Sequence, residues 1–228
     1  MKLIAHRGLW TDPSEQNSAN AIRLAFEAGY DVETDVRSYQ GSLYLSHDPI
    51  VDVSRCLKFE VFLSLAKAYP GRRVFLNIKE DGLIRYFRAH LDQISELQFI
   101  FFDMSVPELV QYAKVFSASQ LCTRLSEFEL RPAAVELCDW IWIDGFFKDP
   151  DLSGASVFLA QKRKSVALVS PELHGRSPEG LWSKLAASGL SEKEAVSLCT
   201  DSCTFAERYF SPRIPLETQS PNDKSHSL

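Results

Sequence analysis

Short apolar runs alternate with longer segments of helical spacing along the chain. Such alternation is typical of βα units. The runs expected to form strands are residues 3–5, 30–36, 74–78, 99–102, 120–122, 140–143, 166–169 and 196–199. The segments expected to form helices are residues 17–27, 60–69, 82–91, 106–115, 127–136, 152–162, 178–187 and 205–210. Eight strand-helix units are the number in a closed (β/α)8 barrel, so the sequence predicts an α/β fold of this kind.

Length and composition fit one such domain. The chain has 228 residues, of which 45% are hydrophobic, and a barrel commonly occupies this length with one core. After residue 211 the sequence becomes poor in apolar residues and rich in Ser and Pro. We therefore expect one barrel domain over residues 1–211 and a disordered tail over residues 212–228.

Charge and hydrophobicity restrict the kind of partner. The net charge of -5 and the pI near 5.6 argue against binding to nucleic acid or to an anionic bilayer. No apolar run approaches the roughly 18 residues that span a membrane, and strand-like sequence at the start leaves no room for a secretory signal. The five cysteines form no CxxC pair and fit reduced core thiols. The expected protein is cytoplasmic, has no integral membrane segment, and acts on a small molecule.

Polar residues stand at the carboxyl end of every expected strand, where the loops of a barrel converge on one mouth. They are His6, Glu33, Asp35, Asn77, Lys79, Asp103, Thr123, Arg124, Asp144, Glu172, His174, Thr200 and Asp201. Asp and Thr after a strand often cap the next helix. For Asp103, Thr200 and Asp201 a capping or supporting role is therefore favoured over direct catalysis.

Four of the residues in the first fifty suit metal-assisted phosphoryl transfer. Glu33 and Asp35 are two apart in an extended segment, so they point to the same side and can share one cation. His6 and His47 suit proton transfer at the two ends of the displacement, because a histidine with a pKa of about 6.5 can act as acid or base near neutrality. The predicted catalytic residues are His6 and His47, and Glu33 and Asp35 are predicted metal ligands.

The order of these motifs resembles the glycerophosphodiester phosphodiesterase family. The matching segments are His6-Arg7-Gly8, Pro13-Ser14-Glu15-Gln16-Asn17-Ser18, Glu33-Thr34-Asp35 and His47-Asp48. The second segment is one residue longer than its family counterpart, and the resemblance is firm over residues 3–48. It implies a TIM barrel of the PLC-like phosphodiesterase type. It also implies hydrolysis of a glycerophosphodiester to glycerol phosphate and an alcohol.

In that family one histidine assists attack of the neighbouring glycerol hydroxyl on phosphorus, and the other protonates the leaving alcohol before a cyclic phosphate is hydrolysed. The resemblance carries these roles to His6 and His47 without deciding between them. It also implies one divalent cation, Mg2+ or Ca2+, and phosphate contacts from Arg7 and Lys79. For Arg7 and Lys79 the alternative role is a structural salt bridge.

The sequence departs from the family at the third strand, where Glu-x-Lys is replaced by Asn77-Ile78-Lys79. An asparagine carbonyl can bind a hard cation without adding charge, so Asn77 is the expected third ligand of a weaker site. Glu80 or Asp81 could substitute if the loop turned back.

A second departure lies between Asp48 and Asn77, where the 28 intervening residues leave only a shortened insertion after the second strand. Farther along, Glu172 and His174 lie in one short loop and could recognise the alcohol or the phosphate. The alternative for this loop is a simple entry to the following helix.

Two other functions remain open. The first is a phospholipase-D-like lyase that forms a cyclic phosphate, as in the spider-venom sphingomyelinases, although those toxins are secreted and disulfide-bonded. The second is a non-catalytic barrel that binds a phosphorylated ligand, suggested by Asn77 and the shortened insertion.

Overall fold

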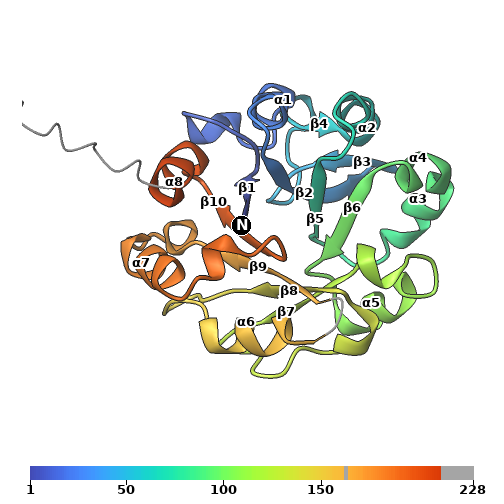
Figure 1. Ribbon diagram of the computed structural model, residues 1–228. Helices are drawn as coiled ribbons and strands as arrows, with labels where there is room; N and C mark the ends of the chain where they lie inside the picture. Colours follow the sequence, from blue (N-terminus) through green and yellow to red (C-terminus); the bar gives the residue numbers. More distant parts are fainter. Residues whose placement is uncertain (162–163, 212–228) are drawn as a thin grey trace, which may run out of the picture.

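A computed structural model describes residues 1–161 and 164–211, in which strands and helices alternate as expected (Figure 1). The strands are β1 (Lys2–His6), β2 (Asp31–Tyr39), β3 (Ser42–Leu45), β4 (Leu57–Lys58), β5 (Arg73–Ile78), β6 (Gln98–Phe102), β7 (Cys122–Leu125), β8 (Trp140–Ile143), β9 (Ser165–Val169) and β10 (Val196–Thr200). The α-helices are α1 (Ala19–Glu27), α2 (Phe59–Lys67), α3 (Ile84–Ala89), α4 (Leu91–Ser95), α5 (Val106–Tyr112), α6 (Leu152–Leu159), α7 (Glu179–Ala187) and α8 (Cys203–Phe210).

Eight of the strands are parallel and curl around a common axis, with the helices outside them (Figure 1). Their order is β7-β8-β9-β10-β1-β2-β5-β6. Between β6 and β7 the only pairing within the described residues is an isolated parallel bridge from Phe101 to Leu121. The fold is therefore α/β with a strongly curled sheet, and its ladder is interrupted at one seam instead of closing fully as expected.

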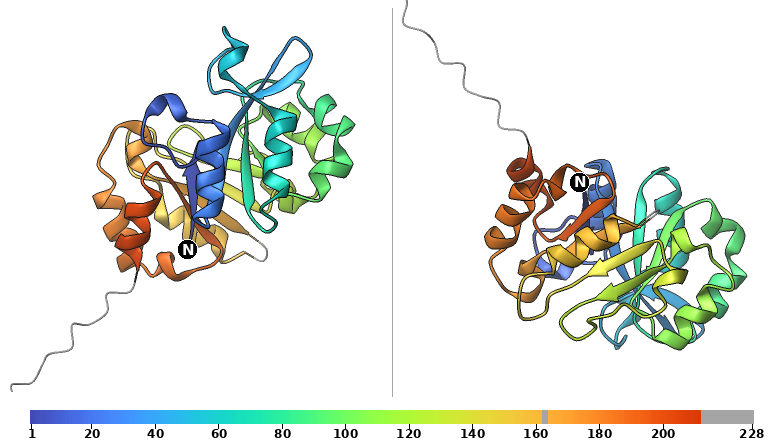
Figure 2. Two further views of the ribbon diagram at one scale, coloured as in Figure 1. Left: turned by 90° about the horizontal axis from the view of Figure 1, so that it is seen from above. Right: turned by 60° about the horizontal axis from the view of Figure 1, so that its bottom comes forward.

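The second unit carries an antiparallel extension. β2 runs on past the ring, turns at Gln40 and Gly41, which both have positive φ, and returns as β3, which pairs with β4. Two consecutive positive φ angles suit the tight turn of a two-residue hairpin. Figure 2 shows this hairpin standing beyond the ring at the end away from the N terminus. The loop after β3 carries His47 to that end.

Two layers of apolar side chains stabilise the ring. Inside it pack Ile4, Phe75, Ile100, Phe102, Cys122, Trp140, Trp142, Ala167, Val169 and Cys199. Outside it, alternate residues of the same strands pack against the helices. All five cysteines are free thiols, and four of them are buried.

The helix expected over residues 127–136 does not form. Pro132 lacks a backbone N–H, and the Glu127 carboxylate accepts hydrogen bonds from the backbone of Phe146 and Phe147. The segment is instead an irregular loop that ends in the 3-10 turn Val135–Leu137. The helix expected over residues 82–91 is divided into α3 and α4 at His90.

Two expectations fall partly or wholly outside the described residues. The expected helix over residues 152–162 ends at Leu159 in the structure, and its last residue is not described. The expected tail over residues 212–228 also lies outside the described part. Within that part, no helix combines the length and apolar character needed to cross a bilayer.

Candidate active site

A cavity of about 320 Å³ opens among the carboxyl ends of the parallel strands. It brings together seven of the nine predicted site residues, namely His6, Arg7, Glu33, His47, Asn77, Lys79 and His174. Asp35 lies directly behind Arg7 and Lys79, which both pair with its carboxylate. Glu172 does not line the cavity. Its carboxylate accepts hydrogen bonds from Ser170 and Thr200.

Strand register explains how the acidic residues meet. His6 on β1 pairs with Glu33 on β2, and Asp35 pairs with Asn77 on β5. Neighbouring residues at one level of a parallel sheet point to the same side, and residues two apart in a strand share that side. All four side chains therefore project into the ring at its carboxyl end.

Three buried oxygens in this group have no hydrogen-bond partner: Oε2 of Glu33, Oδ1 of Asp35 and Oδ1 of Asn77. Buried polar atoms without partners are costly and unusual, so such a cluster indicates a place for a ligand. Carboxylate and amide oxygens are the donors that Mg2+ and Ca2+ prefer. The residues present thus fit one hard divalent cation.

Two of the three unpartnered oxygens belong to carboxylates, those of Glu33 and Asp35. Among residues 1–161 and 164–211, no three His, Cys, Asp or Glu side chains gather as a metal-binding group. Glu80 is bound by the backbone N–H of Ser38, and Asp81 accepts a hydrogen bond from Ser105. Both carboxylates are thereby bound to other partners, and the third unpartnered oxygen of the cluster belongs to Asn77.

Asp35 is held by a network of donors. Nε of Arg7 lies 2.9 Å from Oδ2, and the Asn17 amide donates to the same oxygen over 3.1 Å. Lys79 Nζ lies 3.6 Å from Oδ1. Asn17 in turn accepts a hydrogen bond from Thr34. Arg7 and Lys79 therefore form salt bridges with Asp35, and both also line the cavity.

Asp201 orients His6. Nδ1 of His6 donates to Oδ1 of Asp201 over 2.7 Å, and Nε2 lies 3.9 Å from Oε2 of Glu33. Burial lowers the pKa of His6, but the hydrogen bond to Asp201 and the nearby charge of Glu33 outweigh burial and leave it above its usual value. Burial, followed by the neighbouring Asp35, raises the pKa of Glu33 to about 7.

His47 reaches the same cavity from the loop after β3. Its Nδ1 donates to Oδ1 of Asp48 over 2.8 Å, and Arg37 donates to its backbone carbonyl. The side chain of His47 is 43% exposed, against 15% for His6. Of the two predicted catalytic imidazoles, His47 is therefore the more open to solvent.

The far side of the cavity contains charged groups outside the nine predicted site residues, namely Asp103, Arg124 and Asp144. Nε2 of His174 donates to Asp144 over 2.8 Å, and Arg124 pairs with both Asp103 and Glu129. Arg124 and Asp144 stand at or next to the ends of β7 and β8. That position placed both residues at the expected mouth, although no motif marked either one as a site residue.

Gly8 allows the loop after β1 to pack closely on α1. Its φ is +93°, and a Cβ atom would lie 2.6 Å from the carbonyl carbon of Ala21. Only glycine combines that backbone conformation with such an approach. The backbone at Gly8 therefore lies directly against α1.

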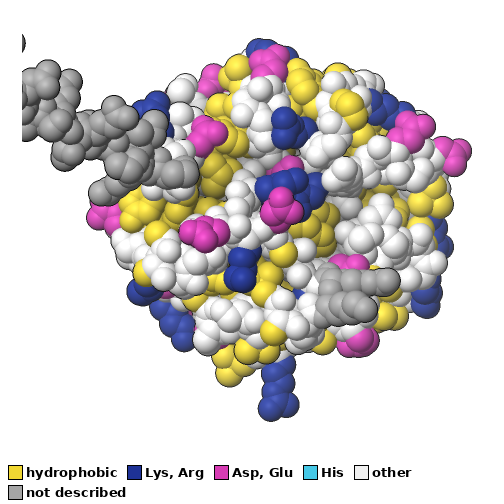
Figure 3. Space-filling view, viewed as in Figure 1, with side chains coloured by type: hydrophobic (Ala, Val, Ile, Leu, Met, Phe, Trp, Pro, Cys, Tyr) yellow, Lys and Arg dark blue, Asp and Glu magenta, His cyan; other side chains and the backbone are white. Residues whose placement is uncertain are grey.

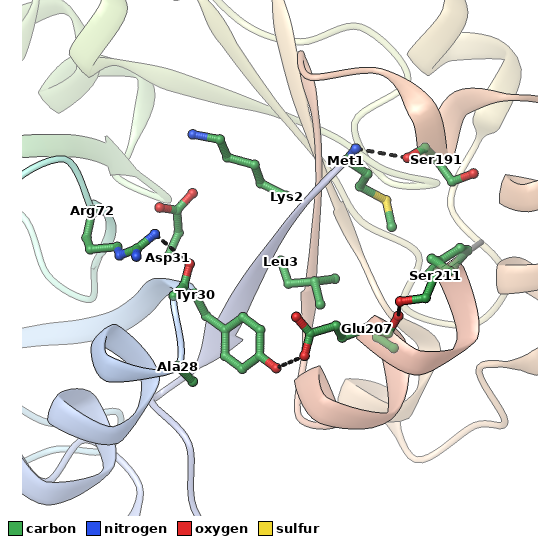
Figure 4. A pocket seen from close by; sticks show the side chains of 13 residues that line it. Met1, Lys2, Leu3, Ala28, Tyr30, Asp31, Arg72, Ser191, Glu207 and Ser211 are labelled. Carbon is green, nitrogen blue, oxygen red and sulfur yellow. Dashed lines mark hydrogen bonds between the residues drawn. The ribbon is translucent and has the colours of Figure 1, made fainter. Parts of the chain in front are cut away.

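A larger cavity, of about 460 Å³, lies at the opposite end of the strands (Figure 4). There the Tyr30 hydroxyl donates to Glu207, and the Met1 ammonium donates to the carbonyl of Ser191. Figure 3 shows this end of the molecule, where Lys, Arg, Asp and Glu side chains gather near the centre. None of the nine predicted site residues lines this cavity, so the smaller cavity is the candidate active site.

Solved structures with the same fold are known. A glycerophosphodiester phosphodiesterase from Parabacteroides distasonis aligns with a TM-score of 0.62 at 17% identity, over 92% of this chain and 96% of its own. One from Agrobacterium tumefaciens gives 0.63 at 16% identity, over 92% and 98%. A glycerophosphoryl diester phosphodiesterase from Parabacteroides distasonis gives 0.65 at 12% identity, over 96% and 88%.

At such identities the similarity establishes a shared fold over nearly the whole chain. No family model matches the sequence, and no curated protein matches it.

Proposed function

We propose that this chain is a glycerophosphodiester phosphodiesterase that uses one divalent cation, Mg2+ or Ca2+, to hydrolyse a small phosphodiester to glycerol phosphate and an alcohol. The observation that carries the proposal is the cluster of unpartnered buried oxygens beside His6 in the cavity at the strand ends. The fold shared with solved phosphodiesterases adds support.

Some of the ionic groups would hold the cation, and others would contact the phosphate. Glu33, Asp35 and Asn77 would hold the cation, which when bound supplies positive charge to the phosphate oxygens and polarises the phosphorus centre. Arg7 and Lys79 line the cavity next to this group and add donors for the remaining oxygens. Asn17 keeps Asp35 oriented through its amide.

The two histidines act as proton acceptor and proton donor. One accepts a proton from the attacking oxygen, which is first a glycerol hydroxyl and later water. The other gives a proton to the alcohol oxygen as its bond to phosphorus breaks. His6 is suited to a fixed geometry because Asp201 holds its Nδ1 and leaves Nε2 toward the cavity. His47 is suited to rapid exchange with water because it is partly exposed.

The architecture proposed here is a (β/α)8 barrel of the PLC-like phosphodiesterase type over residues 1–211. Its insertion between β3 and β5 is short and contains the 3-10 turn Val53–Arg55, β4 and α2. We place the enzyme in the cytoplasm, in lipid metabolism, because its substrates would be the water-soluble products of phospholipid deacylation.

The test is hydrolysis of glycerophosphocholine, glycerophosphoethanolamine and glycerophosphoglycerol by the purified chain with Mg2+, Ca2+, Mn2+ or chelator. We expect equal release of glycerol phosphate and alcohol with at least one metal, and loss of turnover in chelator. Phosphorus NMR identifies the final product, and a stable cyclic phosphate would favour the lyase instead. Phosphate ester binding without turnover of any substrate would favour a non-catalytic barrel and overturn the proposal.

Glu33→Gln makes the metal test specific to this site, since it removes one ligand charge with little change in volume. We expect the variant to need much more metal for half-maximal turnover. Glu136→Gln, on the exposed surface of the loop before β8, is the matched control and should respond to metal as the parent does.

A further inference from the structure

The candidate active-site cavity has two chemically different halves. The half built by β1, β2 and β5 carries the ionic groups described above. The other half contains an apolar surface, where Phe102 and Trp142 stack at a centroid distance of 4.3 Å beside Val169 and Leu173. Its charged groups are paired with each other, Arg124 with Asp103 and His174 with Asp144. We call this surface the apolar half. Phe146 stands at the edge of this half, 5.1 Å from the ring of His174.

The apolar surface continues out of the cavity. Phe146 packs against Phe128 at 5.7 Å, and Phe128 packs against Phe147 at 5.8 Å. Phe128 is 67% exposed and Phe147 is 79% exposed. We call Phe128, Phe146 and Phe147 the aromatic rim. Adjacent exposed phenylalanines beside a cavity are unusual on a soluble domain and indicate a binding surface.

The rim is fixed by hydrogen bonds between two loops. The Glu127 carboxylate, on the loop after β7, accepts from the backbone N–H of Phe146 and of Phe147, on the loop after β8. The Ser126 hydroxyl accepts from the backbone of Phe128. The exposed rings are therefore presented by a braced surface, which lowers the entropy lost when a ligand binds.

The charge beside the rim indicates what binds there. Arg124 lies 5.7 Å from the ring of Phe146, but its guanidinium is paired with Asp103 and Glu129. A guanidinium that is already paired with two carboxylates binds a further anionic group weakly. Apolar surface next to a balanced ion pair fits a hydrocarbon chain better than a charged headgroup.

We propose that the aromatic rim binds a hydrocarbon chain carried by the leaving alcohol, so that the preferred substrates are phosphodiesters whose alcohol bears one aliphatic chain. This inference rests on the proposed phosphodiesterase function. With the phosphate in the ionic half, attacking and leaving oxygens lie on opposite sides of phosphorus. The proposal places the leaving alcohol on the side of the apolar half and the rim. The glycerol hydroxyl forms the new bond to phosphorus and gives its proton to one histidine, the alcohol leaves with a proton from the other, and water then opens the cyclic phosphate.

The experiment compares glycerophosphoethanol, glycerophosphobutanol and glycerophosphooctanol, each below its critical micelle concentration. For the parent, kcat/KM should rise about tenfold or more from the two-carbon to the eight-carbon alcohol, because even partial burial of methylenes contributes to binding. Phe128→Ser combined with Phe147→Ser should flatten the series while leaving kcat/KM for glycerophosphoethanol near the parent value. Both side chains are exposed, so the fold should persist.

Phe205→Ser is the matched control, because Phe205 is 55% exposed on α8 and does not line the catalytic cavity. It should keep the chain-length dependence of the parent. A flat series in the parent, with normal hydrolysis, would overturn the rim proposal and leave the phosphodiesterase function standing. A steep series that survives the double substitution would overturn it as well.

Two other results would each overturn the rim proposal for a different reason. Loss of binding to phosphatidylcholine vesicles in the double variant, with an unchanged series on dispersed substrates, would assign the rim to a membrane surface and overturn the proposal. Absence of hydrolysis for every substrate, including glycerophosphocholine, would refute the phosphodiesterase function and the rim proposal together.

Discussion

Asn77→Asp is the sharpest test of the site, because it adds one negative charge with almost no change in shape. The Asn77 side-chain oxygen is buried and unpartnered, and the residue is level with Asp35 on the adjacent strand. Glu33 and Asp35 are already buried carboxylates. The variant therefore places a third carboxylate in the same group.

Without metal the substitution should destabilise the fold. Adjacent strands lie about 4.8 Å apart, and two unit charges about 5 Å apart repel by roughly 3 kcal/mol at an effective dielectric constant of about 20. Arg7 and Lys79 offset part of this repulsion through their contacts with Asp35. We expect a net loss of about 1–2 kcal/mol in the free energy of unfolding, or about 2–8 °C in Tm for a domain of this size.

With metal bound the substitution should increase stability instead of lowering it, because a third carboxylate attracts the cation. The metal concentration that gives half the maximal rise in Tm should fall at least about tenfold, equivalent to about 1.4 kcal/mol. The assay is a thermal melt in chelator and across a titration of Mg2+ and of Ca2+. Asn20→Asp, exposed on α1, makes the same chemical change away from the site and should shift neither the melt nor the metal response appreciably.

A result with equal melts in chelator and an unchanged metal response would show that Asn77 does not face the cation. The third ligand would then come from elsewhere or from water. The correspondence assumed for the third strand would be wrong. Asn77→Glu, which restores the residue expected from the family resemblance, would in that case also leave the metal response unchanged.

Three other substitutions test separate parts of the reasoning. His6→Ala and His47→Ala should each lower turnover by about two to four orders of magnitude with unchanged circular dichroism, and full activity in either variant would remove that residue from the mechanism. Asp201→Asn should lower the pKa of His6, because the hydrogen bond and charge of Asp201 raise it; the limb of the pH-rate profile due to His6 then moves to lower pH, and an unmoved profile would contradict the assigned role. Gly8→Ala should cost about 2–4 kcal/mol in a denaturant melt, because the positive φ and the contact with Ala21 are both incompatible with a Cβ, and a loss below about 1 kcal/mol would show that the loop relaxes easily.

The ionic half of the site was predictable from short-range rules. Glu33 and Asp35 are two apart in a strand, and this period alone places them on one side. Asn77 and His6 join them because each ends a parallel strand that neighbours β2. Such positions depend on strand order, which the repeated βα units determine well.

The partner of His6 was not predictable in the same way. Asp201 is 195 positions away in the sequence, and an aspartate after a strand is usually expected to cap a helix. Here α8 begins at Cys203, and the Thr200 hydroxyl accepts the hydrogen bond from the backbone of Ser202. Asp201 is thus free to bind His6, and only the closeness of β10 to β1 reveals it.

The helix expected over residues 127–136 shows why the apolar half was also missed. Phe128 and Leu130 are two apart and would lie on opposite faces of such a helix, so an amphipathic helix would have buried only one of them. Instead Glu127 binds the backbone of the next loop, and both side chains are exposed. A pattern of apolar residues predicts that a surface will be buried, but it does not identify the segment or ligand that buries it. In this chain Phe128, which the helix pattern left without a partner, packs against Phe146 at the cavity edge, and the rim proposal assigns its cover to a ligand.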